Sequence, residues 1–224
     1  MNSMNNYENL LLRIYLIPYR IRFRWRNRKR QKISEDAINA TRYRLEEARR
    51  CGSINLDKVY NVGLYIVLFE RDLSAYSSYL FLSKTVWHRQ FAARGMAVLL
   101  YEGCEDIPEL LGKEFRRCLK DLELGDNWFQ QLNDIMCELN KFKIKHAEFL
   151  KKVRNYVGAH REKNALAQID VLDNLNPIDV YRLGAAFSDP LRAFFNFQIK
   201  LMQYVKFPSI MLKEAIKIAE RPSI

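Results

Sequence analysis

Hydrophobic residues recur along the chain at steps of three and four, which is the periodicity of one face of an α-helix. One such stripe consists of Val59, Val62, Ile66, Phe69, Leu73, Tyr76 and Leu80. A longer one consists of Trp128, Leu132, Ile135, Leu139, Phe142, His146, Phe149, Val153, Tyr156 and His160. A β-strand exposes every second residue on one face and cannot produce either pattern. The second stripe predicts one long helix from Asn127 to about Val157.

Capping residues indicate where two further helices begin. Ser34 can cap a helix that ends at Arg50, and Gly52 stands just beyond that end. Ser83 can cap another helix that ends near Gly103. Its apolar positions include Trp87, Phe91 and Leu99. Both segments therefore extend the helical pattern of the chain.

Proline in the first turn of a helix, after a capping residue, marks three more helix starts. These starts are Asp106 with Pro108, Asn176-Pro177 and Asp189-Pro190. The last one leads a helix rich in aromatic residues that Pro208 ends. Its members are Leu191, Phe194, Phe195, Gln198, Met202 and Val205.

The composition excludes folds that need many tight turns. Only 8 Gly and 6 Pro occur among 224 residues, whereas average usage is about 7% and 5%. A β-sandwich, a barrel or a Rossmann sheet is therefore not expected. We predict an all-α helical bundle over residues 34–224, with a basic N-terminal extension over residues 1–33.

Neither a membrane span nor a metal or cofactor site is indicated. The best apolar run, Val62–Phe69, is shorter than the ~20 residues that a membrane span needs. A second apolar run, Leu10–Ile17, is followed by the positive cluster Arg20–Lys32, whereas a signal peptide carries its positive charge before the apolar run. We expect a cytoplasmic protein without a removed leader. The four cysteines lie far apart without metal-binding spacing, and GxGxxG, GxxxxGK[ST] and GxSxG are absent, so we expect no metal and no cofactor.

The segment Val153–Glu162 reads VRNYVGAHRE and contains the residue types that acid–base chemistry on a phosphate needs. Arg154 and Asn155 precede His160, which follows the small residues Gly158 and Ala159. A histidine can exchange a proton near neutral pH, and an arginine carries a permanent charge that matches phosphate oxygens. The motif resembles the Arg-x(4–6)-His signature of the HEPN family (higher eukaryotes and prokaryotes nucleotide-binding domain), in particular abortive-infection proteins of bacteria. The resemblance extends over about Asp57–Val205.

This resemblance implies a metal-independent endoribonuclease that acts as a homodimer in phage defence or in a toxin–antitoxin system, with an antitoxin as a possible partner. His160 would be the acid/base that assists attack by the RNA 2′-hydroxyl, and Arg154 would stabilise the phosphate. Asn155 would orient one of them or hydrogen-bond the substrate. On a straight helix Arg154 and His160 lie about 120° apart around the axis and about 9 Å along it.

Two other interpretations remain open for this segment. His160 continues the apolar stripe of the long helix, so it can be an interior histidine flanked by a solvated Arg154. HEPN domains without catalysis also exist, which leaves a helical module that binds nucleic acid, a nucleotide or a partner protein. His146 and His88 have no ligand-type neighbours at helical spacing, and we interpret both as structural.

The net charge of +11 is concentrated in Arg20–Lys32, where thirteen residues hold eight cations and no acid. We expect nucleic-acid contacts from Arg20, Arg22, Phe23, Arg24, Trp25, Arg26, Arg28, Lys29 and Arg30. Cations neutralise phosphates and aromatic rings stack on unpaired bases, so RNA is the favoured partner. An anionic membrane surface is the rival, because an apolar run precedes the cluster, and an acidic protein partner is a third alternative.

Overall fold

The structure is a computed structural model that describes residues 17–157, 163–206, 215–216 and 218–219. Within these residues every regular element is a helix and none is a strand. The predicted all-α class is thereby confirmed. By its internal contacts the chain divides into two compact units, Met1–Ala37 and Ile38–Ile224.

Helix α2, Ile17–Arg50, passes through the boundary between the two units without interruption. Our prediction that Ser34 caps the start of a helix is therefore wrong. The residues before Ser34 are mostly Arg, Lys and Gln, which are themselves good helix formers. A capping residue starts a helix only where the preceding residues leave the helical conformation.

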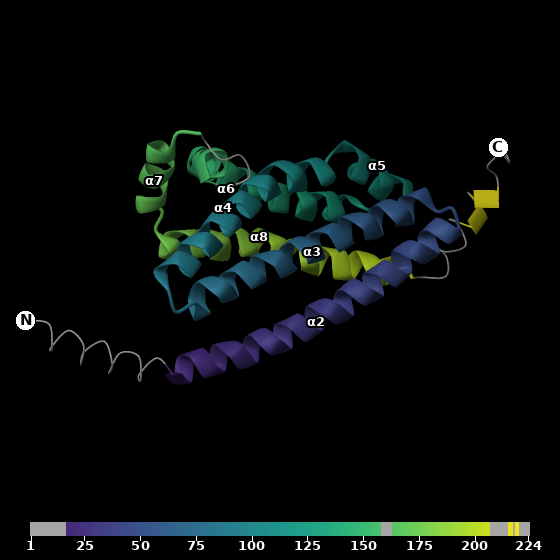
Figure 1. Cartoon of the computed structure of the whole chain (residues 1–224). Coiled ribbons are helices and arrows are strands. Elements are labelled where there is room, and N and C mark those ends of the chain that lie inside the picture. The colour runs from purple at the N-terminus through teal and green to yellow at the C-terminus, as the bar shows by residue number, and fades with distance from the viewer. Residues whose placement is uncertain (1–16, 158–162, 207–214, 217, 220–224) are drawn as a thin grey trace, which may run out of the picture. The chain divides into compact units, whose positions relative to one another are not determined.

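The unit Ile38–Ile224 is a bundle in which four long helices pack against one another and two short ones complete the chain path (Figure 1). The long helices are α3 (Ile54–Leu82), α4 (Val86–Leu110), α6 (Asp126–Val157) and α8 (Pro177–Tyr204). The short helices are α5 (Lys113–Asp121) and α7 (Ala165–Asp173). Figure 1 shows α7 across one end of the bundle, close to where α6 ends.

Most of the predicted stripes of α3 and α6 lies in the core of this bundle, but Phe149 of the α6 stripe is exposed and Leu150 is buried in its place. Phe187 of α8 is fully buried between them, with its ring centroid 5.6 Å from that of Phe69 and 4.9 Å from that of Phe142. Burying one such side chain stabilises the fold by about 1.5–3 kcal/mol. The two periodic patterns thus meet at Phe187 of α8, which lies just before the aromatic segment predicted to begin at Leu191.

Helix α4 differs from its predicted form at both ends. It begins after Thr85, whose hydroxyl accepts a hydrogen bond from the His88 N–H at 3.2 Å, and not after Ser83. It also continues through Gly103. The buried face consists of Ala92, Ala93, Met96, Ala97, Leu100, Gly103, Cys104 and Ile107, whereas Trp87 and Phe91 are exposed.

Of the three proline-marked starts, only Asn176-Pro177 is confirmed, where the Asn176 side chain accepts from Ile178 N–H at 2.9 Å. Pro108 lies inside α4 and Pro190 inside α8, so both other predictions are wrong. An interior proline costs about 3 kcal/mol of helix stability. At Pro190 the burial of the ring and of its neighbours Phe187 and Leu191 offsets that cost.

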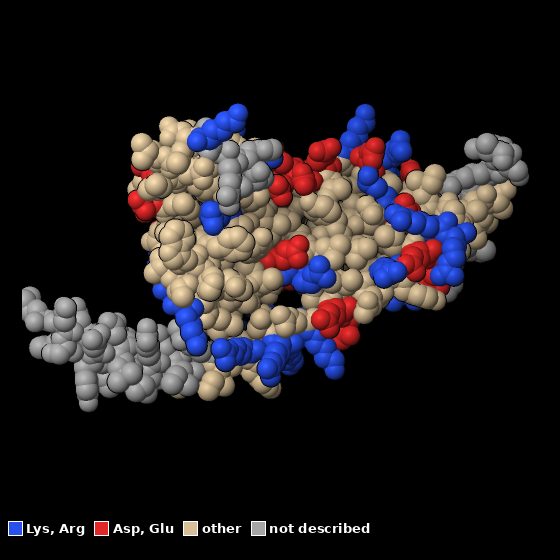
Figure 2. Space-filling model, viewed as in Figure 1, with Lys and Arg blue, Asp and Glu red and all other residues tan. Residues whose placement is uncertain are grey.

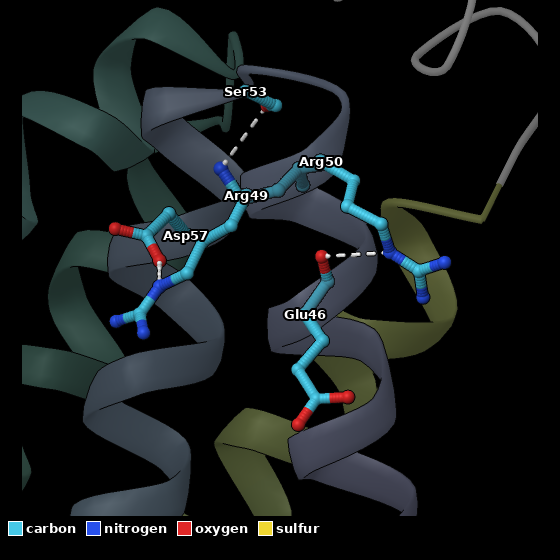
Figure 3. Close-up of polar contacts among 6 residues, drawn as sticks. Glu46, Arg49, Arg50, Ser53 and Asp57 are labelled. Carbon is cyan, nitrogen blue, oxygen red and sulfur yellow. Dashed lines mark hydrogen bonds and ion pairs between the residues drawn. The ribbon is translucent and has the colours of Figure 1, made fainter.

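The turn from α2 into α3 shows how local chemistry ends one helix and starts the next (Figure 3). Gly52 has φ +69°, its N–H donates to Arg49 C=O, and Ser53 N–H donates to Ala48 C=O, which is the Schellman arrangement. Ser53 then caps α3 by accepting from the Leu56 N–H. Arg49 spans the turn with an ion pair of 2.7 Å to Asp57. Gly52 stands where the sequence placed it.

Candidate functional site

Helix α6 carries the predicted Arg154 and Asn155 in its last turn. It runs from Asp126 to Val157, which agrees with the predicted long helix. The acidic residue in the first turn and Arg154 in the last turn both interact favourably with the helix dipole. Val153 and Val157 are buried and anchor this end of the helix on the core. Arg154 is therefore held at the edge of the packed interface.

The guanidinium of Arg154 lies over the ring of Tyr101 from α4, with its central carbon 5.2 Å from the ring centroid. The side chain is half-buried, and its Nε is buried without a hydrogen-bond partner among the described residues. No described carboxylate forms a salt bridge with it. An unpaired buried donor costs free energy that a hydrogen-bond acceptor would recover. This end of α6 therefore presents a fixed cation suited to an anionic ligand.

Asn155 does not join Arg154 in one cluster. Consecutive residues of a helix are about 100° apart, and Asn155 is exposed while Arg154 lies against α4. The structure thus brings Arg154 to Tyr101 and leaves Asn155 on the solvent side. His160 lies outside the described residues. The sequence did not single out Tyr101 as a functional residue. Tyr101 lies on the helix that we predicted to begin at Ser83, seven residues after Arg94.

His146 and His88 each pack beside an aromatic ring, that of Phe142 and that of Tyr79. Burial lowers the pKa of His146, and its ring packs 4.8 Å from that of Phe142. His146 lines a groove of about 600 Å³ between α6 and α8. The carboxylates that line the same groove already have partners within the protein. Glu138 pairs with Lys141 at 2.7 Å, and Asp189 pairs with an arginine of its own helix. Across the described residues no group of three potential ligands could hold a metal ion.

The basic cluster forms part of α2 in the unit Met1–Ala37. The side chains of Arg22, Arg24, Trp25, Arg26, Arg28, Lys29, Arg30 and Lys32 are exposed, and that of Phe23 is half-buried. Arg20 is also helical in its backbone. Residues two apart differ by about 200° around a helix, so these cations surround the helix and do not share one face. Figure 2 shows this segment as a run of blue, while both signs are mixed on the bundle.

A helix with cations on all sides lacks the continuous apolar face through which an amphipathic helix binds a membrane surface. Exposed Ile21 and Trp25 stand among the arginines. In the described part of the chain, no helix combines the length and the apolar character needed to cross a bilayer. The cation-rich segment is better suited to a polyanion that can approach from several sides.

Two features thus stand out, namely the Arg154–Tyr101 pair at the end of α6 and the cationic segment of α2. Comparison with protein-family models, with curated proteins and with solved structures gives no significant match to this chain.

Proposed function

We propose that the chain is a metal-independent endoribonuclease of the HEPN type, with Arg154 stabilising the phosphate and His160 as acid/base. The single observation that carries the proposal is the half-buried Arg154 guanidinium, which lies on Tyr101 six residues before His160 and whose Nε has no partner among the described residues. We further propose a cytoplasmic homodimer that acts in phage defence or as the toxin of a toxin–antitoxin pair. The four free thiols agree with a reducing compartment.

In the proposed reaction the 2′-hydroxyl oxygen of RNA attacks the adjacent phosphorus. His160 takes the 2′-hydroxyl proton, the bond from phosphorus to the 5′-oxygen breaks, and that oxygen takes a proton from solvent, to which protonated His160 returns its own. The products are a 2′,3′-cyclic phosphate and a 5′-hydroxyl end. Arg154 donates N–H groups to the phosphate oxygens whose charge grows during attack, and a guanidinium is suited to this because it stays protonated.

Tyr101 is a positioning residue in this scheme. Its ring supports the guanidinium from one side and attracts the cation. The Arg154 side chain therefore loses little further freedom when it binds a phosphate. Asn155 faces solvent, so of its two expected roles we propose the hydrogen bond to the substrate and not the orientation of Arg154.

The test is incubation of the purified full chain with labelled single-stranded RNA in EDTA, beside Arg154→Ala, His160→Ala and Lys151→Ala. Lys151 is an exposed cation one turn before Arg154, so its removal matches the change in charge. We expect wild type and Lys151→Ala to leave 2′,3′-cyclic phosphate or 3′-phosphate ends. General acid–base catalysis contributes about 10²–10⁴-fold, so His160→Ala should lose activity on that scale. Loss of one donor that stabilises developing negative charge costs about 10²–10³-fold, which we expect for Arg154→Ala. Equal cleavage by all four proteins would refute the assignment.

A second candidate function is nucleic-acid binding without cleavage, and the cations around the N-terminal part of α2 favour it. Each neutralised phosphate releases counterions, so the binding constant should fall steeply with salt. Salt-sensitive RNA binding by a protein that cleaves none of several RNAs would favour this function over the nuclease.

A further inference from the structure

The outer face of α4 carries large side chains where a helix of a bundle normally carries small polar ones. Trp87, Phe91, Arg94, Val98 and Tyr101 follow one another at steps of four, three, four and three, so they form one line along the helix, the outer stripe. The side chains of Trp87 and Phe91 are 74% and 62% exposed. The opposite face buries alanines and Met96. The two rings at the start of the stripe are thus mostly in solvent, whereas Arg94, Val98 and Tyr101 further along it are half-buried.

Cations accompany the two exposed rings, and the first carboxylates of α4, those of Glu102 and Glu105, follow at its Tyr101 end. The Arg94 guanidinium carbon lies 5.5 Å from the centroid of Phe91, and that of Arg154 lies 5.2 Å from the centroid of Tyr101. Between Asp72 and Glu102 the chain contains three cations and no carboxylate. The outer stripe therefore combines bare aromatic surface, two arginines supported on rings and a local excess of positive charge.

We propose that the outer stripe is a stacking track for single-stranded RNA, along which the strand reaches Arg154. This inference rests on the proposed function, which supplies RNA as the ligand. Trp87 and Phe91 would stack on unpaired bases, while Arg94 and Arg154 would contact the phosphates between and beyond them. From Trp87 to Tyr101 the stripe advances by fourteen residue steps, or about 21 Å at 1.5 Å per residue. That length accommodates several nucleotides.

The chemistry of the stripe favours an unpaired strand over other occupants. In a duplex the faces of the bases are already stacked, so exposed rings gain little from it, whereas every unpaired base offers a face. A second copy docking through the same stripe would bring like charges together. A membrane would be contacted mainly through rings and basic residues near the α3–α4 turn, which leaves the Arg154–Tyr101 end of the stripe without a role.

The experiment measures binding of a fluorescent single-stranded 2′-O-methyl RNA, which has no 2′-hydroxyl and is not cleaved. The variants are Trp87→Ala, Phe91→Ala and Trp87→Phe, and the matched control is Ile144→Ala, because Ile144 is an apolar side chain of α6 that is 85% exposed. We expect each alanine variant of the stripe to weaken binding about tenfold. Trp87→Phe should keep most of the affinity, and Ile144→Ala should keep all of it. A duplex of the same length should distinguish the variants much less.

Unchanged affinity in Trp87→Ala and Phe91→Ala overturns the track, and so does a loss confined to dimerisation or to binding of anionic lipid vesicles. If Arg154→Ala abolishes cleavage of ordinary RNA while the stripe variants bind normally, the track fails and the nuclease stands. If the stripe variants lose binding and no RNA is ever cleaved, the track stands and the nuclease fails.

Discussion

Gly103 lies on the buried side of α4, at a point where two aromatic rings approach the helix backbone. An alanine Cβ at this position would overlap Cζ of Phe69 and would lie 2.6 Å from Cε2 of that ring. It would also lie 3.2 Å from Cε1 of Phe187. Real Cβ atoms do not approach other atoms so closely, so the rings must shift in Gly103→Ala.

The rings have little room to move. Phe69 is 5% exposed and Phe187 is fully buried, and Phe187 is held from the other side by Phe142. Overpacking of a core costs about 1–3 kcal/mol, and rigid neighbours place this site toward the upper end. Alanine regains about 0.5–1 kcal/mol through its better helix propensity. We expect a net loss of about 2 kcal/mol, or about 4–8 °C in Tm for a domain of this size.

The assay is thermal and urea unfolding followed by far-ultraviolet circular dichroism, with two glycine variants as controls. In Gly184→Ala the new Cβ meets Cε of Met96, and a methionine end can swing aside, so the loss should be smaller. In Gly125→Ala the Cβ enters open space and stability should be unchanged. If Gly103→Ala proves as stable as Gly125→Ala, the rigidity that we ascribe to the rings is wrong.

Two further predictions concern titratable side chains. Burial raises the pKa of the Cys104 thiol to about 12 and also raises that of Cys118. A thiol reagent at pH about 8 should therefore label the exposed Cys51 and Cys137 quickly, and Cys104 and Cys118 only when the protein unfolds. Fast labelling of all four cysteines would contradict the burial. Burial lowers the pKa of His146 in the folded state. As the pH falls through the ordinary range of histidine, the unfolded state therefore takes up a proton before the folded state does, and the free energy of unfolding decreases. The decrease in unfolding free energy between pH about 7.5 and about 5.5 should be smaller in His146→Asn, and an equal decrease in both proteins would show that other groups cause it.

The parts of the fold that were predictable from the sequence are those that local rules decide. The stripe of α3, the extent of α6 and the start at Asn176-Pro177 depend on periodicity and capping within a few residues, and all are confirmed. The starts expected at Ser34 and Asp189-Pro190 failed because helix formers or buried neighbours carried the helix through a position that favours a break. Helix α7, capped by Asn164, is too short to show a stripe and was missed.

Which face of α4 is buried could not be predicted from the sequence, because it depends on distances between helices. Trp87 and Phe91 are apolar positions of the predicted helix, and large apolar side chains are usually buried, yet both are exposed. The small residues face the core because they let other helices approach closely, as Gly103 does for Phe69. Tyr101 escaped notice for a similar reason, since its contact with Arg154 joins two helices that are distant in the chain.

The two faces of α4 therefore separate stability from the proposed function, and this separation makes the proposals testable. A substitution on the inward face, such as Gly103→Ala, changes packing between buried rings and should lower Tm. A substitution on the outer stripe, such as Trp87→Ala, removes a side chain that is mostly in solvent and should change stability by no more than about 0.5 kcal/mol. Loss of RNA binding in Trp87→Ala at unchanged Tm would thus report on contact with RNA. The reverse result, a large fall in Tm, would mean that Trp87 is covered in the native protein and that the outer stripe is an interface.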